Sequence, residues 1–269
     1  MIFALSLLFS PSVETDVVYS KVGTQELKMD IYQPLEKKPM MPAIVVIHGG
    51  GWIGGNKRDM KPLCDALAKQ GMVAASVQYR LAPTVKWPGF YDDVQTAVRY
   101  LRQNSKKLGI DPKRIGSAGA SAGGHLALLL GFTDTRDKDR EYSTYSSRVS
   151  AVLDIFGPTD MARDYPPSFD ILFATVIGKP KAQSAAEIKA ASPVNFIDRL
   201  SAPVFIVHGT ADQVVPIAQS KWLEQKLKLA KIPVIARYIN GMKHEIPQTA
   251  DVLKTMEEGI SWLKMTLTK

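Results

Sequence analysis

The sequence around Ser121 has the residue types that serine acyl transfer requires. Gly119-Ala120-Ser121-Ala122-Gly123 joins a predicted short strand, 114–118, to a predicted Ala- and Leu-rich helix, 122–131. A serine on a sharp strand-to-helix turn needs small neighbours so that strand and helix can approach each other. Such a turn places the hydroxyl at a helix N-terminus, where unpaired N–H groups favour negative charge. The pattern therefore predicts a nucleophile whose reaction generates an oxyanion.

A serine nucleophile needs a general base, and the chain has only four histidines to supply one. His125 lies one helical turn after the serine and is expected to point into the body of the protein. His208 ends a predicted buried strand, and His48 begins a glycine-rich loop, so structural roles are expected for both. His244 follows the predicted strand 233–239 on a loop and is the candidate base.

The base in turn needs a carboxylate that fixes its tautomer. Asp212 follows the predicted buried strand 203–207, so its loop and the loop of His244 should open on the same edge of a sheet. Asp154 and Asp160 lie in or after the preceding predicted strand and are the alternatives. We favour Asp212 as the acid.

A second loop, His48-Gly49-Gly50-Gly51-Trp52, follows the apolar run 43–47. Three consecutive glycines let the backbone approach a ligand closely, at a cost in chain entropy that suggests a functional reason. The predicted oxyanion hole combines the N–H of Ala122 with those of Gly50 and Gly51. Trp52 is expected to cap the loop or to line the acyl side of a substrate pocket.

The elements that position these residues alternate between strand and helix. Two short alternating segments around Gly23 predict an N-terminal antiparallel hairpin. Continuous apolar, β-branched runs are typical of strands buried on both faces of a parallel sheet. The sequence therefore predicts an α/β fold with a mostly parallel eight-stranded sheet flanked by helices. The segment 157–192 is longer than a connection between two parallel strands requires. We expect it to form a lid-like excursion, so that any lid is small or absent.

Composition excludes several classes of protein. The 269 residues carry a net charge of 34 − 26 = +8, but the lysines and arginines are scattered, so no nucleic-acid face is predicted. No apolar run reaches transmembrane length, so integral membrane association is not expected. Cys64 is expected to be a small buried apolar residue. No metal or other cofactor is predicted, and a homodimer is left open.

Residues 1–12 have the apolarity of a signal-peptide core but lack a basic n-region and a clear cleavage site. A signal-peptide remnant is favoured over an N-terminal arm, which favours a periplasmic or secreted location over a cytoplasmic one. Residues 13–269 are predicted to form a single domain.

Together these motifs resemble the α/β-hydrolase superfamily, in the branch with a His-Gly-Gly-Gly-Trp loop. The chain is similar to hormone-sensitive-lipase-like esterases and, more closely, to bacterial BD-FAE-like carboxylesterases. The segments that match are 48–52, 79–81, 87–88, 109–115, 119–126, 191–193 and 208–212, with His244. The resemblance implies hydrolysis of small esters or of acetyl or feruloyl groups on polysaccharide. Ala120 departs from the lipase-like branch, where aspartate is usual.

Three functions compete at this point. The first is a cofactor-free serine carboxylesterase acting on short-chain, small-molecule or carbohydrate-linked esters. The second is an arylformamidase-like amidase, which would share the glycine loop and differ in the pocket. The third, a non-catalytic binding protein with a hydrolase fold, is disfavoured because no member of the Ser-Asp-His set is missing.

Overall fold

The computed structural model describes residues 11–136 and 140–269. Its centre is an eight-stranded sheet in the order β1-β2-β4-β3-β5-β6-β7-β8. The strands are β1 (Ser12–Val22), β2 (Gln25–Gln33), β3 (Met41–Ile47), β4 (Val73–Val77), β5 (Ile110–Ala120), β6 (Val152–Ile155), β7 (Val204–Gly209) and β8 (Val234–Ile239). Strand β2 runs antiparallel to β1 and β4, and all other neighbours are parallel. The predicted mostly parallel sheet with an N-terminal hairpin is confirmed.

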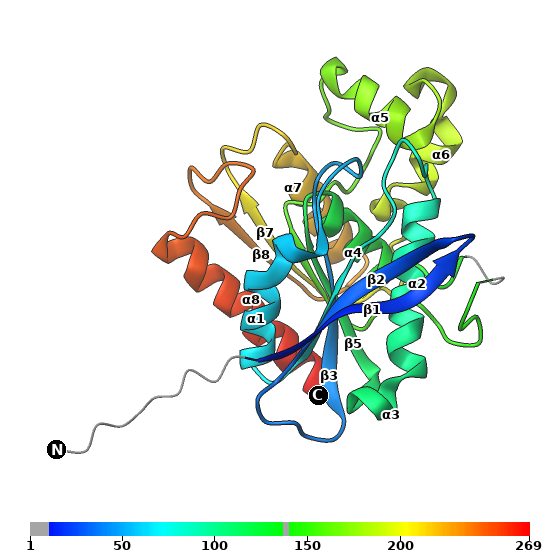
Figure 1. Cartoon of the computed structure of the whole chain (residues 1–269). Helices are drawn as coiled ribbons and strands as arrows, with labels where there is room; N and C mark the ends of the chain where they lie inside the picture. Colours follow the sequence, from blue (N-terminus) through cyan, green and yellow to red (C-terminus); the bar gives the residue numbers. More distant parts are fainter. Residues whose placement is uncertain (1–10, 137–139) are drawn as a thin grey trace.

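The helices cover both faces of this sheet (Figure 1). The α-helices are α1 (Lys61–Lys69), α2 (Gly89–Gln103), α3 (Ser105–Leu108), α4 (Ala122–Phe132), α5 (Asp170–Ile177), α6 (Ala185–Ala190), α7 (Ala218–Leu229) and α8 (Ala250–Thr268). Apolar side chains of α2, α4 and α7 form one buried cluster with the sheet, and those of α1 and α8 form a second.

Strand β3 shows why the sheet has two cores. Ala43, Val45 and Ile47 pack in the α2/α4/α7 cluster, whereas Ile44 and Val46 pack in the α1/α8 cluster. Successive side chains of a strand point to opposite faces, so a strand covered by helices on both faces must be apolar throughout. Cys64 of α1 is buried in the second cluster, as expected.

Two predicted boundaries are corrected. The apolar stripe of Val94, Val98 and Leu101 predicts one helix over 91–108, but the helix is divided at Asn104, and α3 is a separate turn that ends at Gly109 in a left-handed conformation. The Asp111-Pro112 pair predicts a turn before the predicted strand 114–118, but both residues lie within β5. The pairing of β3 with β5 jumps from Met41–Ile110 to Ala43–Ile115, so the start of β5 is irregular rather than a separate turn.

The excursion at 157–192 carries α5 and α6 and lies at the top of Figure 1, at the end of the sheet where the parallel strands finish. Three aromatic rings hold its first half together, since Tyr165 and Phe169 both lie against Phe173, with centroids 5.1 and 6.3 Å away. This excursion therefore brings an aromatic cluster to the carboxyl edge of the strands.

Helix α4 is buried at every residue, so we expect it to contribute strongly to stability. Replacing Leu129, which has no exposed surface, with alanine should lower the free energy of unfolding by about 2–5 kcal/mol, because the substitution leaves a cavity. Urea unfolding would measure the change. Leu229, 73% exposed at the end of α7, is the matched control, and its replacement by alanine should cost under about 0.5 kcal/mol. Equal decreases in the free energy of unfolding for the two variants would contradict the burial of α4 in the core.

Candidate active site

Ser121 lies on the turn between β5 and α4, in a strained backbone conformation with φ = 55° and ψ = −123°. Its N–H donates to the carbonyl of Ile155 on the neighbouring β6 (2.9 Å). Small neighbours are required here, because a Cβ added to Gly123 would lie 2.0 Å from the carbonyl oxygen of Ile47. A Cβ added to Gly119 would lie 2.4 Å from the carbonyl of Gly123. The turn therefore requires glycine at both positions, because the strand and helix backbones are in direct contact there.

A hydrogen-bonded chain links Ser121 to two residues from the last loops of the sheet. The Ser121 hydroxyl lies 2.8 Å from Nε2 of His244, and Nδ1 of His244 lies 2.7 Å from Oδ2 of Asp212. With the proton on Nδ1, the ring donates to the carboxylate and accepts from the serine hydroxyl. The structure thus brings together the three residues that the sequence singled out.

Asp212 is held from two further directions. Its Oδ1 accepts the N–H groups of Val214 and Val215 at 2.8 and 2.9 Å. Nε2 of the buried His208 lies 3.2 Å from Oδ2 and 2.9 Å from the carbonyl of Val215. Burial raises the pKa of the Asp212 carboxyl, but hydrogen bonds from His208 and His244 outweigh burial and hold this pKa well below its ordinary value. The side chain has no exposed surface and is built to remain ionised.

The two alternative acids occupy other environments. Asp154 of β6 is fully buried beside the turn between β5 and α4, and its Oδ1 accepts the N–H of Gly157 at 3.0 Å. Its Oδ2 has no hydrogen-bond partner among residues 11–136 and 140–269. Asp160 accepts the N–H of Ala162 within its own loop. Neither carboxylate is hydrogen-bonded to His244.

The remaining histidines hold structure. Nδ1 of His48 lies 2.8 Å from the carbonyl of Gly49, and its ring stacks on Tyr79 at a centroid distance of 4.3 Å. His125 is buried, with Nε2 at 2.6 Å from the carbonyl of Ala191, and burial lowers its pKa to about 4. Nδ1 of His125 accepts the indole N–H of Trp52 at 3.3 Å, so neither ring nitrogen of His125 is hydrogen-bonded to Ser121.

The glycine loop lies against the serine. A Cβ added to Gly49 would meet the Cβ of Ser121 at 3.3 Å, and Gly50 and Gly51 have φ values of +105° and +60°. Neither Gly50 nor Gly51 donates its N–H to any other described residue. Ala122 is the first residue of α4, where the N–H groups have no partner within the helix. Gly50 and Gly51 line the same cavity as Ser121, so the predicted oxyanion-hole donors remain a prediction that this arrangement permits.

A cavity of about 450 Å³ opens above Ser121. Its lining is mainly apolar and includes Phe156, Tyr165, Phe169, Leu172 and Phe173. Trp52 also lines it, but the indole is 2% exposed and its Nε1 donates to Nδ1 of His125 at 3.3 Å. Trp52 therefore anchors the floor of the cavity more than it offers a free face.

The sequence did not single out several of these residues. The ring of Phe156 lies 4.5 Å from the ring of His244, and five of the lining residues come from the 157–192 excursion. The sequence of this excursion shows an apolar segment, but the spacing of the apolar residues does not indicate which rings line the cavity above Ser121. A structural role was predicted for His208, but its position in the sequence does not indicate the direct contact with the Asp212 carboxylate.

Two other features are absent from the described part of the chain. No three histidine, cysteine, aspartate or glutamate side chains among these residues are grouped as metal ligands would be. None of the described helices combines the length and apolarity needed to cross a bilayer. Residues 1–10, where a signal-peptide remnant was expected, lie outside the described residues.

Most of the sequence matches a known protein family. The BD-FAE family model matches residues 29–227. The probable carboxylic ester hydrolase LipM of Mycobacterium tuberculosis is 30% identical over 85% of this chain and 55% of its own length. The chain thus spans about half the length of the curated relatives it matches first.

Solved structures of esterases are similar to this fold over nearly the whole chain. A truncated carbohydrate esterase from gut microbiota has a TM-score of 0.85 and 30% identity, covering 97% of this chain and 98% of that one. Thermogutta terrifontis esterase 2 with butyrate bound has a TM-score of 0.81 and 30% identity, covering 94% and 93% of the two chains. The same esterase is described as phosphorylated by paraoxon in another structure, with a TM-score of 0.81 and 29% identity over 95% and 94%.

The buried Asp154 gives a prediction about stability. Burial raises its pKa to about 7 from 3.8, so between these values the folded protein binds a proton that the unfolded chain releases. Stability should therefore fall as pH rises through this window, by on the order of a few kcal/mol. Asp154→Asn should remove that loss, so its free energy of unfolding relative to wild type should be higher at pH 8 than at pH 5.

Urea unfolding at the two pH values would measure this difference. Asp160→Asn, at a partly exposed carboxylate, is the matched control. If Asp154→Asn changes stability equally at both pH values, the buried carboxyl does not titrate as its surroundings imply.

Proposed function

Because the chain belongs to the BD-FAE family and has the α/β-hydrolase fold, we propose that it is a serine carboxylesterase that hydrolyses short-chain acyl esters. One observation carries the proposal: Ser121, His244 and Asp212 form a continuous hydrogen-bonded chain at the floor of an apolar cavity. The names of the relatives, as ester hydrolases and esterases, support the same reaction class.

In the proposed reaction, the Ser121 oxygen attacks the ester carbonyl as its proton passes to Nε2 of His244. The negative charge that develops on the carbonyl oxygen is stabilised by the N–H groups of Gly50, Gly51 and Ala122. Collapse of the tetrahedral intermediate breaks the ester C–O bond, and His244 returns its proton to the departing alcohol. Water then attacks the acyl-enzyme by the same route, with His244 again accepting and returning the proton.

The role proposed for Asp212 is electrostatic. A carboxylate kept ionised beside Nδ1 of His244 fixes the productive tautomer and stabilises the imidazolium that forms during attack. The support from His208 and two backbone N–H groups suits that task, because these donors favour the charged carboxylate.

The acyl group is proposed to be short, such as acetyl, with feruloyl as the larger candidate. The cavity wall formed by Leu172 lies close to the glycine loop, since a Cβ added to Gly51 would be 3.7 Å from a Leu172 methyl. A carbohydrate-linked ester would place its alcohol portion at the open side of the cavity. A panel of acetylated and feruloylated sugars would identify the natural alcohol.

Hydrolysis of p-nitrophenyl acetate separates this proposal from a binding protein with a hydrolase fold. Turnover of N-formylkynurenine separates an esterase from an arylformamidase-like amidase. Rapid formamide hydrolysis with negligible ester hydrolysis would overturn the esterase proposal.

Removal of each proposed catalytic group should lower kcat by several orders of magnitude. Ser121→Ala and His244→Ala should each lower kcat by about 10⁶, and Asp212→Asn by about 10⁴. The Asp212→Asn/His244→Ala double variant should be far less impaired than the product of the two losses, since the three residues act as one unit. Measuring kcat/KM on one short ester tests all of these variants.

Asp160→Asn is the matched control for the acid and should stay near wild type. Near-normal activity in Asp212→Asn with a crippled Asp160→Asn or Asp154→Asn would place the acid on the earlier strand.

Chain-length selectivity tests the proposed acyl pocket. Rates on p-nitrophenyl acetate and butyrate should exceed the rate on the decanoate. Leu172→Ala should raise the relative rate on longer chains by about tenfold, because each methylene accommodated in an apolar pocket contributes about 1 kcal/mol or more. Ile171→Ala, at an 80% exposed position of the same helix, should leave the profile unchanged. A wild-type preference for decanoate would refute this pocket assignment.

A further inference from the structure

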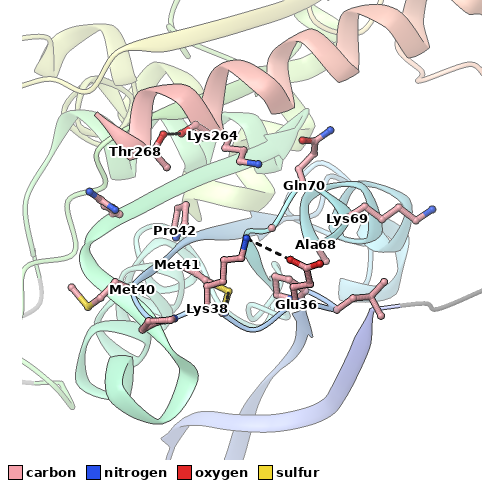
Figure 2. Close-up of a pocket in the computed structure, with 15 residues that line it drawn as sticks. Glu36, Lys38, Met40, Met41, Pro42, Ala68, Lys69, Gln70, Lys264 and Thr268 are labelled. Carbon is pink, nitrogen blue, oxygen red and sulfur yellow. Dashed lines mark hydrogen bonds and ion pairs between the residues drawn. The ribbon is translucent and has the colours of Figure 1, made fainter.

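Most of the net positive charge of the chain gathers at the end of the sheet opposite the cavity above Ser121. Two hollows of about 540 and 260 Å³ lie side by side there and share Lys38, Pro39 and Met41 in their walls. Figure 2 shows the larger one, bounded by the segment between β2 and β3, by α1 and by α8. We call the two hollows together the basic face.

Seven basic residues and one acidic residue, Glu36, line the basic face. The basic residues are Lys37, Lys38, Lys69, Lys106, Lys107, Arg114 and Lys264. The balance of 7 − 1 = +6 compares with +8 for the whole chain, so the fold concentrates charge that is scattered along the sequence.

Few of these cations are neutralised within the protein. Lys38 pairs with Glu36 and Arg114 with Asp111, both at 3.5 Å. The five other lysines are exposed and form no ion pair with any residue in the described ranges.

Helix ends explain only part of this cluster. Lys69 lies in the last turn of α1, and Lys106 and Lys107 lie in the last turn of α3, where cations favour the helix dipole. Lys37 lies in a loop, and Lys264 precedes the last turn of α8, so neither has that role. The excess is available for an external anion.

Exposed apolar side chains identify which anionic partner fits. Leu35 and Met40 flank Lys37 and Lys38 on the segment between β2 and β3, and they are 53% and 54% exposed. A soluble polyanion gives such side chains nothing to contact. An anionic bilayer offers phosphates to the lysines and an apolar boundary to Leu35 and Met40.

We propose that the basic face is a docking surface for a bilayer that contains anionic lipids, with Leu35 and Met40 entering the headgroup boundary. The protein binds peripherally through lysines and two apolar side chains. The cavity above Ser121 then faces away from the lipid, since Ser121 follows the carboxyl end of β5 and the basic face lies at the opposite edge.

Vesicle sedimentation tests the proposal with the full chain. At about 0.1 M salt, the protein should bind vesicles of phosphatidylcholine that contain about one third phosphatidylglycerol. It should dissociate from them as the salt concentration rises, and it should not bind vesicles of pure phosphatidylcholine. Lys37→Glu/Lys107→Glu should weaken binding by about 25-fold or more, since each lysine near an anionic surface contributes about fivefold. Leu35→Ser should weaken binding without changing its salt dependence.

Lys189→Glu/Lys254→Glu is the matched control, because it makes the same change in net charge at exposed positions away from the basic face. It should retain most of the binding, and circular dichroism should show all variants folded. Equal weakening by the control pair would mean that diffuse charge is responsible and would overturn the proposal. No binding to anionic vesicles, equal binding to neutral ones, or binding to soluble polygalacturonate alone would also overturn it.

Discussion

The close approach of α4 to the end of β3 is the constraint on which the site depends. The backbone of Gly123 lies so near the carbonyl of Ile47 that no side chain fits between them. This contact holds the end of β3, and therefore the glycine loop that follows it, against the turn that carries Ser121. Close backbone packing therefore places the glycine loop beside Ser121.

The same turn organises what lies beneath it. Gly124 and Gly157 leave just enough space for the Asp154 carboxyl, since a Cβ at either position would lie 2.4 Å from Oδ1. Burying a carboxyl with one unpartnered oxygen is costly, and the protein retains it directly under its proposed nucleophile. Asp212 is buried as well but receives donors on both oxygens. Two carboxylates, one on β6 and one in the loop after the neighbouring β7, are thereby driven towards opposite protonation states.

The architecture was predictable because local patterns and fold rules agree. Continuous apolar strands such as 43–47 imply burial on both faces, and their alternation with helices implies a parallel sheet with loops at one edge. Ser121, Asp212 and His244 each follow such a strand, so their meeting at one edge needs no knowledge of side-chain packing. Their catalytic roles are still predictions that the variants must decide.

Features that depend on long-range packing were not predictable. The sequence favours a helix-start role for Asp93, yet the residue is buried between Arg80 and Arg140, each at 2.7 Å. Nothing in the spacing of these residues indicates that pairing. The rings over the cavity come from an irregular excursion without periodicity, so neither their order nor their facing could be derived. The gathering of lysines into the basic face likewise arises from segments that meet only in the fold.

The two ends of the sheet are separated by the length of its strands. Strand β3 has seven residues, which at roughly 3.3 Å each gives about 23 Å between its amino and carboxyl ends. The field of an external charge decays over about 8 Å at physiological ionic strength. A charged layer against the amino edge would therefore be electrically remote from Asp212 and His244. Attachment at one pole and reactivity at the other can thus be tuned separately, by exchange of surface lysines at one pole and of pocket side chains at the other.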